Sequence, residues 1–343
     1  MTSVLSALGV TVPVLAAPMA GGPSTSELVI AAGRTGSLGF LAGGYKTAEA
    51  LAEQIASVRA AGVGFGVNLF APNPVPVDPE AFRRYAGSIN AEARRHGVDL
   101  RDAPIVEDDD RWEEKIELLL GDPVPIVGFT FGIPSRSVIS ALRGAGSLVV
   151  QTVTSADEAR QAADAGVDLL AVQASAAGGH SGTLTPERIP DEVPLLELIA
   201  RVRAAVELPV LAAGGLATPD AVAGIVHAGA DAALVGTALL RTDEAGTSAP
   251  YRGGLADAAR EGTVVTRAFT GRPARALRNE FTDRYSAQAP AGYPALHHLT
   301  SPMRKAAASA SDPERINLWA GTGYRNAMAE PAKATLTRLA SRL

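Results

Sequence analysis

One histidine lies in the segment of this chain that is best suited to acid–base chemistry. Residues 171–183 read AVQASAAGGHSGT, which places His180 directly after a glycine pair and before Ser181 and Gly182. An imidazole exchanges protons near neutral pH, and glycine lets the surrounding backbone adopt tight turns. We therefore predict that His180 is a general base, with a buried structural histidine as the alternative.

The other four histidines are weaker candidates. His96 closes a charged helical segment and His227 precedes an Ala-Gly helix stop, so both are interpreted as structural or surface residues. His297 and His298 follow Tyr293 in the C-terminal part of the chain. Either could line the mouth of a site, but the preferred interpretation is a hydrogen-bonded loop histidine.

The chain contains no cysteine. Thiolate nucleophiles, disulfides and cysteine-held zinc or iron–sulfur clusters are therefore excluded. No group of Asp, Glu and His with metal-ligand spacing accompanies His180, so no metal site is expected. The chemistry must come from oxygen and nitrogen groups or from a bound cofactor.

Two glycine-containing segments indicate an anion site. Residues 212–222 and 234–240 put glycine backbone amides and a threonine hydroxyl on adjacent loops, each of which leads directly into a helix start. Converging amides bind anions, and the loops after strands seven and eight of a (β/α)8 barrel often hold phosphate. We predict phosphate binding here, with simple tight turns as the alternative. A Walker lysine and a G-x-G-x-x-G fingerprint are absent, which disfavours tightly bound NAD.

Eight apolar runs are predicted to be the strands that position these groups. Because the runs are nearly continuous in apolar residues, they are typical of parallel strands covered on both faces. The runs are 14–19, 38–43, 65–70, 126–132, 148–153, 169–174, 210–215 and 233–239. Helical segments with capping signals alternate with them, including a capping box at residues 155–158. This pattern predicts a (β/α)8 barrel, with a doubly wound open sheet as the alternative.

Two segments exceed what a barrel needs. Residues 71–125 form a long third crossover that is predicted to hold two helices and a proline-rich loop. Residues 248–343 are predicted to form a mainly helical C-terminal lobe over the barrel mouth, following a barrel of residues 1–247.

Polar and glycine residues are predicted to ring the barrel mouth, because each closes a strand. They are residues 18–20, Gly43, Gly44, Asn68, Thr130, Gln151, Gln173, Gly214, Gly215, Gly236 and Thr237. A ring of neutral hydrogen-bonding groups favours a large planar ligand over a metal, although each group alone could simply cap a helix.

Composition restricts the class of partner. The formal net charge is −5 and the chain has no Lys/Arg-rich run, so a small molecule is expected and nucleic acid is not. No apolar run is long enough to cross a bilayer. The first 20 residues lack a basic start and Pro13 interrupts them, so we interpret them as a first strand and not as a signal peptide. We therefore expect a cytoplasmic protein. Its expected oligomeric state is a monomer or a homodimer.

The chain resembles the nitronate monooxygenase family, FMN enzymes formerly called 2-nitropropane dioxygenases. The matching motifs are, in order, APMAGGPST, GVNLF, DDRWEEKIELLL with VGFTFGIPS, VQASAAGGHSGT, LAAGGLATPDAV, ALVGTALL, YPALHHLTSPMR and NLWAGTG. Their order and spacing cover nearly the whole length, and the last motifs are similar to the bacterial class that takes small alkyl nitronates.

The resemblance implies an FMN whose phosphate lies on the loops after strands seven and eight. The residues implied to lie by the flavin ring or its ribityl chain are Met19, Ala20, Asn68, Gln173 and Gly178, and those implied to hold the phosphate are Gly215, Leu234, Val235, Gly236 and Thr237. His180 matches the family's base, which removes the α-proton of a neutral nitroalkane. The protein supplies placement and electrostatics, and the flavin supplies the redox chemistry.

The implied activity is oxidation of alkyl nitronates, and of nitroalkanes, by O2 to a carbonyl compound and nitrite, as in nitroalkane detoxification. One alternative is an NAD(P)H-dependent FMN reductase acting on quinones or enoyl thioesters. Others are a cofactor-free isomerase or lyase for a phosphorylated substrate, with His180 as acid–base, and a non-catalytic flavin sensor.

Three positions depart from the family pattern. The family often has glutamate where this chain has Ala176, glutamine where it has Thr322, and an aromatic residue where it has His298. Tyr251 matches a tyrosine at the mouth. We expect the departures to affect the choice of substrate more than flavin binding.

Overall fold

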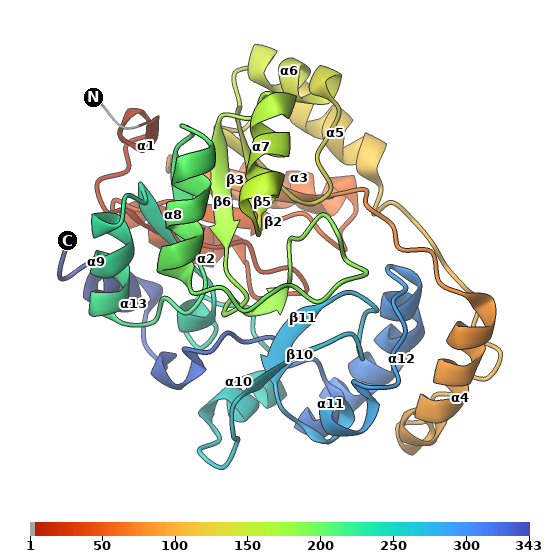
Figure 1. The fold of residues 1–343 in the computed structure, drawn as a ribbon. Helices are drawn as coiled ribbons and strands as arrows, with labels where there is room; N and C mark the ends of the chain where they lie inside the picture. The colour runs from red at the N-terminus through yellow and green to blue at the C-terminus, as the bar shows by residue number, and fades with distance from the viewer. Residues whose placement is uncertain (1–3) are drawn as a thin grey trace.

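Eight parallel strands form a closed barrel in a computed structural model that describes residues 4–343 (Figure 1). They are β1 (Val14–Ala16), β2 (Gly39–Ala42), β3 (Phe65–Ala71), β4 (Ile126–Phe131), β5 (Leu148–Val153), β6 (Leu169–Gln173), β8 (Val210–Ala213) and β9 (Ala232–Val235). Each strand pairs with the next one in this order, and β9 pairs with β1. The predicted (β/α)8 barrel is confirmed, because an open doubly wound sheet has no such closing pair.

Helices precede and separate the barrel strands, and most of them cover the outside of the barrel. They are α1 (Val4–Ala7), α2 (Ser26–Arg34), α3 (Ala48–Ala60), α4 (Pro79–Arg95), α5 (Trp112–Gly121), α6 (Arg136–Gly144), α7 (Ala156–Ala165), α8 (Leu195–Ala205) and α9 (Pro219–His227). Side-chain caps begin five of these helices, since Thr25, Thr47, Ser135, Ser155 and Thr218 each accept a backbone N–H bond at the N-cap. The long third crossover holds two helices, α4 and α5, as predicted.

The capping box at Ser155 is only half present. Ser155 accepts a bond from the N–H of Glu158, but the Glu158 carboxylate does not return to the N-cap backbone. Its Oε2 accepts from the N–H and the hydroxyl of Thr154, one residue before the N-cap, and its Oε1 accepts from the Thr183 hydroxyl at 2.9 Å and the Leu184 N–H at 2.8 Å. Glu158 therefore ties α7 to the chain that follows His180.

Side chains on each barrel strand alternate between two packed layers. Leu15, Phe40, Ile126, Val150 and Leu211 fill the inside of the barrel. The residues between them on the strands pack outward against the helices and form the largest hydrophobic cluster. This alternation decides which residues at a strand end reach the barrel mouth.

The chain after β9 builds a lobe beside the barrel mouth. It contains η1 (Thr237–Leu239), α10 (Ala249–Ala256), β10 (Thr263–Thr266), β11 (Ala274–Leu277), α11 (Glu280–Tyr285), α12 (Ala295–Ser309), η2 (Pro313–Arg315), η3 (Tyr324–Asn326) and α13 (Ala332–Leu339). The antiparallel pair β10 and β11 binds a two-residue strand β7 (Gly179–His180), so the order is β10-β11-β7. The last helix, α13, returns to the barrel and packs against α2 and α9 (Figure 1).

Helix α4 leaves the barrel and packs against the lobe (Figure 1). Phe82, Tyr85 and Ile89 of α4 share one buried cluster with Phe269 and Leu296. The Tyr85 hydroxyl also donates to the Ala268 carbonyl at 2.6 Å. The third crossover therefore forms part of the lobe core.

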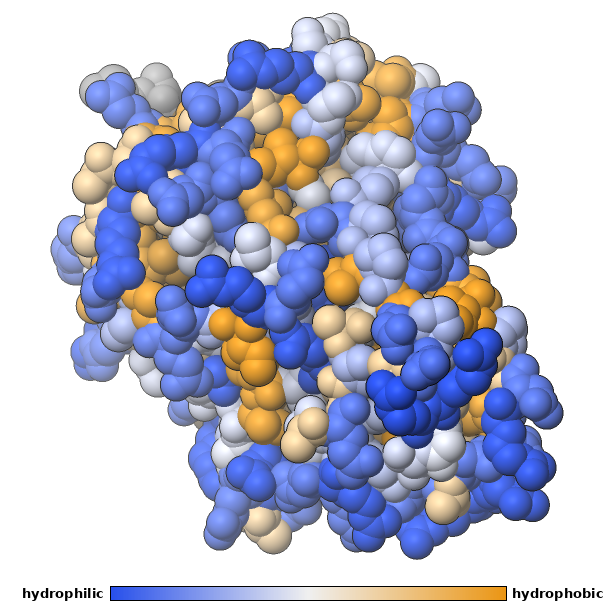
Figure 2. Space-filling model, turned by 45° about the vertical axis from the view of Figure 1, so that its right-hand side comes forward, coloured by the Kyte–Doolittle hydropathy of each residue, from blue (hydrophilic) through white to orange (hydrophobic). Residues whose placement is uncertain are grey.

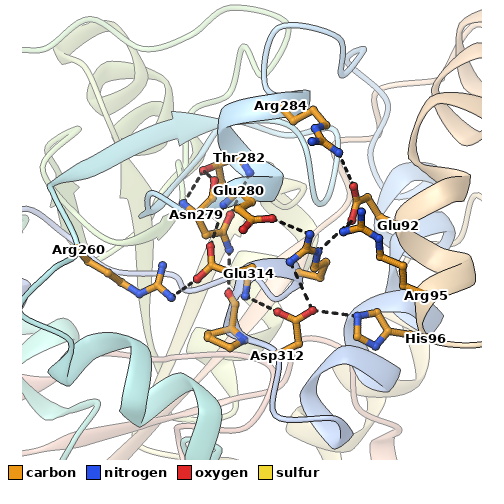
Figure 3. Close-up of polar contacts among 12 residues, drawn as sticks. Glu92, Arg95, His96, Arg260, Asn279, Glu280, Thr282, Arg284, Asp312 and Glu314 are labelled. Carbon is orange, nitrogen blue, oxygen red and sulfur yellow. Dashed lines mark hydrogen bonds and ion pairs between the residues drawn. The ribbon is translucent and has the colours of Figure 1, made fainter.

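Ion pairs reinforce this contact (Figure 3). The buried Glu92 carboxylate accepts bonds from Arg284 at 2.6 Å and Arg315 at 3.0 Å, and His96 pairs with Asp312 at 3.0 Å. His96 is therefore structural, because it lies between α4 and η2.

The surface in Figure 2 is mainly hydrophilic, with apolar side chains in small groups between charged ones. Among residues 4–343, none of the helices combines the length and apolarity needed to cross a membrane.

Candidate active site

A cavity of about 1040 Å³ opens at the carboxyl ends of the barrel strands and extends under the lobe. It is lined by every candidate site residue predicted from the sequence. These are Met19, Ala20, Asn68, Gln173, Gly178, His180, Gly215, Leu234, Val235, Gly236 and Thr237. The structure thus brings together residues that lie more than 200 positions apart in the chain.

His180 lies in a short strand, whereas the glycines around it indicated tight turns. Gly179 and His180 form β7, in which His180 pairs with Ala274 of β11. The side-chain amide of Gln173 closes the loop, because its Nε2 donates to the His180 carbonyl at 3.0 Å and its Oε1 accepts from the Gly182 N–H at 2.7 Å. Gly179 has a φ of 78°, which a non-glycine residue rarely adopts. The histidine backbone is therefore held on both sides.

The His180 imidazole is enclosed by side chains from the lobe and β4. Its Nε2 lies 2.9 Å from the Thr270 hydroxyl oxygen, and the rings of Phe131, Tyr293 and Trp319 lie 5.3–5.9 Å away, centroid to centroid. Burial, followed by the charges of Arg272 and Arg304, lowers the pKa of His180 to about 3. The ring is therefore neutral, which a general base requires.

Arg272 is a buried cation next to this histidine. Its guanidinium lies 3.9 Å from the centroid of the Phe131 ring and donates to the carbonyls of Thr183 at 2.5 Å and Ser181 at 3.4 Å. Its side chain is fully buried, and no carboxylate of residues 4–343 lies within ion-pair distance of it. Burial lowers the pKa of Arg272 to about 10, so the group stays charged at neutral pH.

A second arginine lies at the mouth of the cavity. Arg304 donates to His297 Nδ1 at 3.3 Å and to Asn317 Oδ1 at 3.0 Å. The His297 ring stacks on Tyr45 with 4.1 Å between centroids, and burial and then Arg304 hold the pKa of His297 well below its usual value. His298 pairs with Asp108 at 2.9 Å.

The interpretation of His297 and His298 as loop residues is wrong. Both lie in the first turn of α12, and both line the cavity. Helical geometry places consecutive residues on different sides of the axis, so one ring meets Tyr45 and the other meets Asp108.

The opposite end of the cavity has unpaired backbone donors. Gly214 and Gly215 have φ angles of 121° and 73°. The N–H groups of Gly215, Gly236 and Thr237 have no acceptor among the described residues. Unpaired amides that face a cavity favour an anion, so the geometry is suited to a phosphate.

Residues 319–323 of the lobe cross over this end. The Gly321 N–H donates to the Thr237 hydroxyl at 2.9 Å, and the Thr322 N–H donates to the Ala176 carbonyl at 3.0 Å. A Cβ on Gly178 would lie 2.5 Å from the Gly321 nitrogen and 2.6 Å from the Ala320 carbonyl carbon. The lobe backbone therefore packs so closely against Gly178 that a side chain does not fit there.

Two of the three departures from the family pattern lie at this end. The Ala176 Cβ and the Thr322 Oγ1 are each 3.5 Å from the position of a Cβ on Gly215. Both residues therefore lie next to Gly215, whereas His298 lines the cavity. Tyr251 also lines the cavity, and its hydroxyl donates to the Trp319 carbonyl.

The predicted ring of strand-end residues is correct except at Gly43 and Gln151. Gln151 is fully buried on the side of β5 that faces the helices, together with Val149 and Val153. Thr152, one residue later, lines the cavity and lies 3.2 Å from Thr130. The error is one of parity, because successive strand residues point to opposite sides.

Several residues around His180 were missed by the sequence analysis. Thr270, Arg272 and Trp319 come from the lobe, and Phe131 ends β4 with a φ of 85°, which is uncommon for a bulky residue. The one available signal was the arginine in the Thr-Gly-Arg-Pro sequence at 270–273, a charge between turn-forming residues.

Comparisons with known proteins agree on one family. The family model for nitronate monooxygenase matches residues 2–341. A probable nitronate monooxygenase of Staphylococcus aureus (strain Newman) is 32% identical over 345 residues, covering 98% of this chain and 95% of the relative. The crystal structure of nitroalkane oxidase from Streptomyces ansochromogenes is 45% identical, with a TM-score of 0.93 and coverage of 99% and 98%. FabK from Thermotoga maritima, at 24% identity, a TM-score of 0.77 and coverage of 100% and 96%, shares the fold.

Proposed function

The chain belongs to the nitronate monooxygenase family, and from this premise we propose that it is an FMN-dependent enzyme that oxidises alkyl nitronates with O2. The products would be a carbonyl compound and nitrite, and neutral nitroalkanes would also be substrates. One observation carries the proposal: a single cavity joins the unpaired amides of Gly215, Gly236 and Thr237 to a neutral His180.

The residues present fit an FMN. Three unpaired N–H groups at one end are suited to the phosphate, and Gly214 and Gly215 form the turn there with positive φ angles that favour glycine. The strand ends between this site and His180 carry neutral groups that are suited to the ribityl chain and ring. When bound, the flavin would accept electrons from the substrate and pass them to O2.

The chain's own residues would hold and deprotonate the substrate. Arg272 and Arg304 place positive charge near His180, which favours a nitronate anion over the neutral molecule. His180 would take the α-proton of a neutral nitroalkane, and a preformed nitronate would not need this step. Phe131, Tyr293 and Trp319 surround the imidazole and shield part of it from water.

Purified protein loaded with FMN tests this proposal. We expect a yellow flavin spectrum and, with ethyl nitronate, oxygen uptake and nitrite release without any nicotinamide. No affinity for FMN, or an FMN-loaded protein that is inert towards nitronates, would contradict it. Rapid anaerobic bleaching of the flavin by NADH or NADPH would instead favour a flavin reductase.

A further inference from the structure

We propose that Thr270 is a positioning residue that sets the tautomer of His180. The Thr270 hydroxyl oxygen accepts the Nε2–H of the imidazole, so that Nδ1 is unprotonated and takes the α-proton of a neutral nitroalkane. This inference rests on the proposed function, because that function is what makes His180 a base.

The hydrogen bonds of the Thr270 hydroxyl favour this tautomer. Its oxygen lies 2.9 Å from His180 Nε2 and 3.4 Å from the Arg272 carbonyl oxygen, and it has only one proton to donate. If the hydroxyl donates to Arg272, it accepts from Nε2–H, and both contacts are satisfied. If it donates to Nε2, no N–H or O–H of the described chain donates to the buried Arg272 carbonyl. Unpaired buried acceptors are costly, so the first arrangement is preferred.

Both partners of this hydrogen bond are fixed in place. Thr270 is 1% exposed and lies in a turn in which the Gly271 N–H donates to the Arg267 carbonyl at 2.8 Å. A Cβ on Gly271 would lie 2.4 Å from the Gly292 carbonyl oxygen, so the turn packs directly against backbone. His180 is held by Gln173 and by pairing with β11. The hydroxyl can therefore act as a fixed acceptor.

The tautomer matters because the ring carries a single proton. Two cations, the buried Arg272 and the half-buried Arg304, act against an imidazolium in the resting protein. In the proposed step the substrate Cα–H bond breaks and an Nδ1–H bond forms. The electron pair of the broken bond moves onto the nitro oxygens and gives the nitronate, and the imidazolium later releases its proton to water.

The experiment compares Thr270→Val and Thr270→Ser in the FMN-loaded protein, with neutral nitroethane and with ethyl nitronate as substrates. For Thr270→Val we expect kcat/KM on nitroethane to fall about 5- to 10-fold, since one hydrogen bond worth about 1 kcal/mol no longer selects the tautomer. Activity on ethyl nitronate should change less than about 2-fold, and Thr270→Ser should restore the nitroethane reaction. Thr266→Val is the matched control, because Thr266 is a buried threonine of the same lobe that bonds Ser286.

A second readout does not depend on turnover. ¹⁵N chemical shifts of the histidine rings, with His180 assigned by its loss in His180→Gln, should show a proton on Nε2 in the unsubstituted protein and a mixture in Thr270→Val. Equal losses on both substrates, no loss on either, or a proton on Nδ1 in the unsubstituted protein would overturn the proposal. If the unsubstituted protein fails to oxidise ethyl nitronate, the proposed function fails, and the shifts still decide the tautomer.

Discussion

The two ends of the cavity are built from different chemistry. The barrel end presents backbone N–H groups and small neutral side chains, as at Gly215, Gly236 and Thr237. The lobe end presents cations and rings, including Arg272 and Arg304. His180 follows the barrel strand β6 in the chain but pairs with β11 of the lobe, so it lies where the barrel and the lobe meet. We therefore expect that substitutions at the barrel end change cofactor binding, and that substitutions at the lobe end change proton transfer.

Replacing His180 should give the largest difference between the activity on a neutral nitroalkane and the activity on a nitronate. For His180→Ala we expect kcat/KM on neutral nitroethane to fall about 10²- to 10⁴-fold, the usual contribution of a general base. Ethyl nitronate is already ionised, so its oxidation should stay within a few-fold of the unsubstituted protein. Steady-state oxygen uptake with both substrates checks this, and equal losses would show that the ends do not act separately.

A substitution at Gly178 should disturb the barrel end instead. In Gly178→Ala the new Cβ would meet the backbone of Ala320 and Gly321, so residues 319–323 must move away. Such overpacking costs about 1–3 kcal/mol, and we expect activity on both substrates to fall together by about 10- to 100-fold at subsaturating FMN. Gly87→Ala is the control, since a Cβ there meets nothing within 4 Å. A loss confined to the neutral substrate would contradict the assignment.

Removing a lobe charge should move the pH profile. His180 acts as a base only when unprotonated, so with a pKa of about 3 the nitroethane kcat/KM should show no acidic limb between pH 5 and 8. In Arg272→Met one cause of the lowered pKa is gone, although burial remains the larger one. We expect the acidic limb to move up from about pH 3 but to stay well below the ordinary histidine value of about 6.5, so kcat/KM on nitroethane should fall only at the acidic end of the profile.

Arg272→Lys tests whether the charge or the hydrogen bonds of Arg272 set the pH profile. Lysine keeps the charge but loses the forked bonds to the Thr183 and Ser181 carbonyls. Its acidic limb should stay near that of the unsubstituted protein, even if kcat falls. A limb that does not move in Arg272→Met would show that the lobe charge does not tune His180.

The smallest effect is expected at the hydrogen bond from the Gly321 N–H to the Thr237 hydroxyl, which joins the lobe to the barrel. Thr237→Val removes the acceptor of the Gly321 N–H, which costs about 1 kcal/mol and should raise the Kd for FMN about 3- to 10-fold. Thr242→Val is the control, because the Thr242 hydroxyl lies nearby in the chain and, among residues 4–343, bonds only the Leu239 carbonyl. Fluorescence titration with FMN measures both, and equal changes in the two variants would count against a specific link.

The barrel end was predictable from sequence because its signals are local. Apolar runs predicted the strands, and glycines at the ends of strands predicted where the amides of Gly215 and Gly236 would be free. The parity of Gln151 was missed, since a run that is apolar on both faces does not show which residues point inward.

The lobe end was not predictable, because it depends on pairing between distant segments. Gly179 and His180 become a strand only through β11, which lies about 95 residues later in the chain. Thr270 and Arg272 reach the imidazole through that same pairing, and α4 joins the lobe core from the third crossover. No local pattern encodes these contacts.

The most direct test of whether the two ends act separately is to titrate FMN into cofactor-free protein. The titration compares the unsubstituted protein with His180→Ala and Gly178→Ala. His180→Ala should bind FMN within about 2-fold of the unsubstituted protein, since it changes only the lobe-side chemistry, while Gly178→Ala should bind about 10- to 100-fold more weakly. Equal losses in the two variants, or a larger loss in His180→Ala, would contradict this prediction.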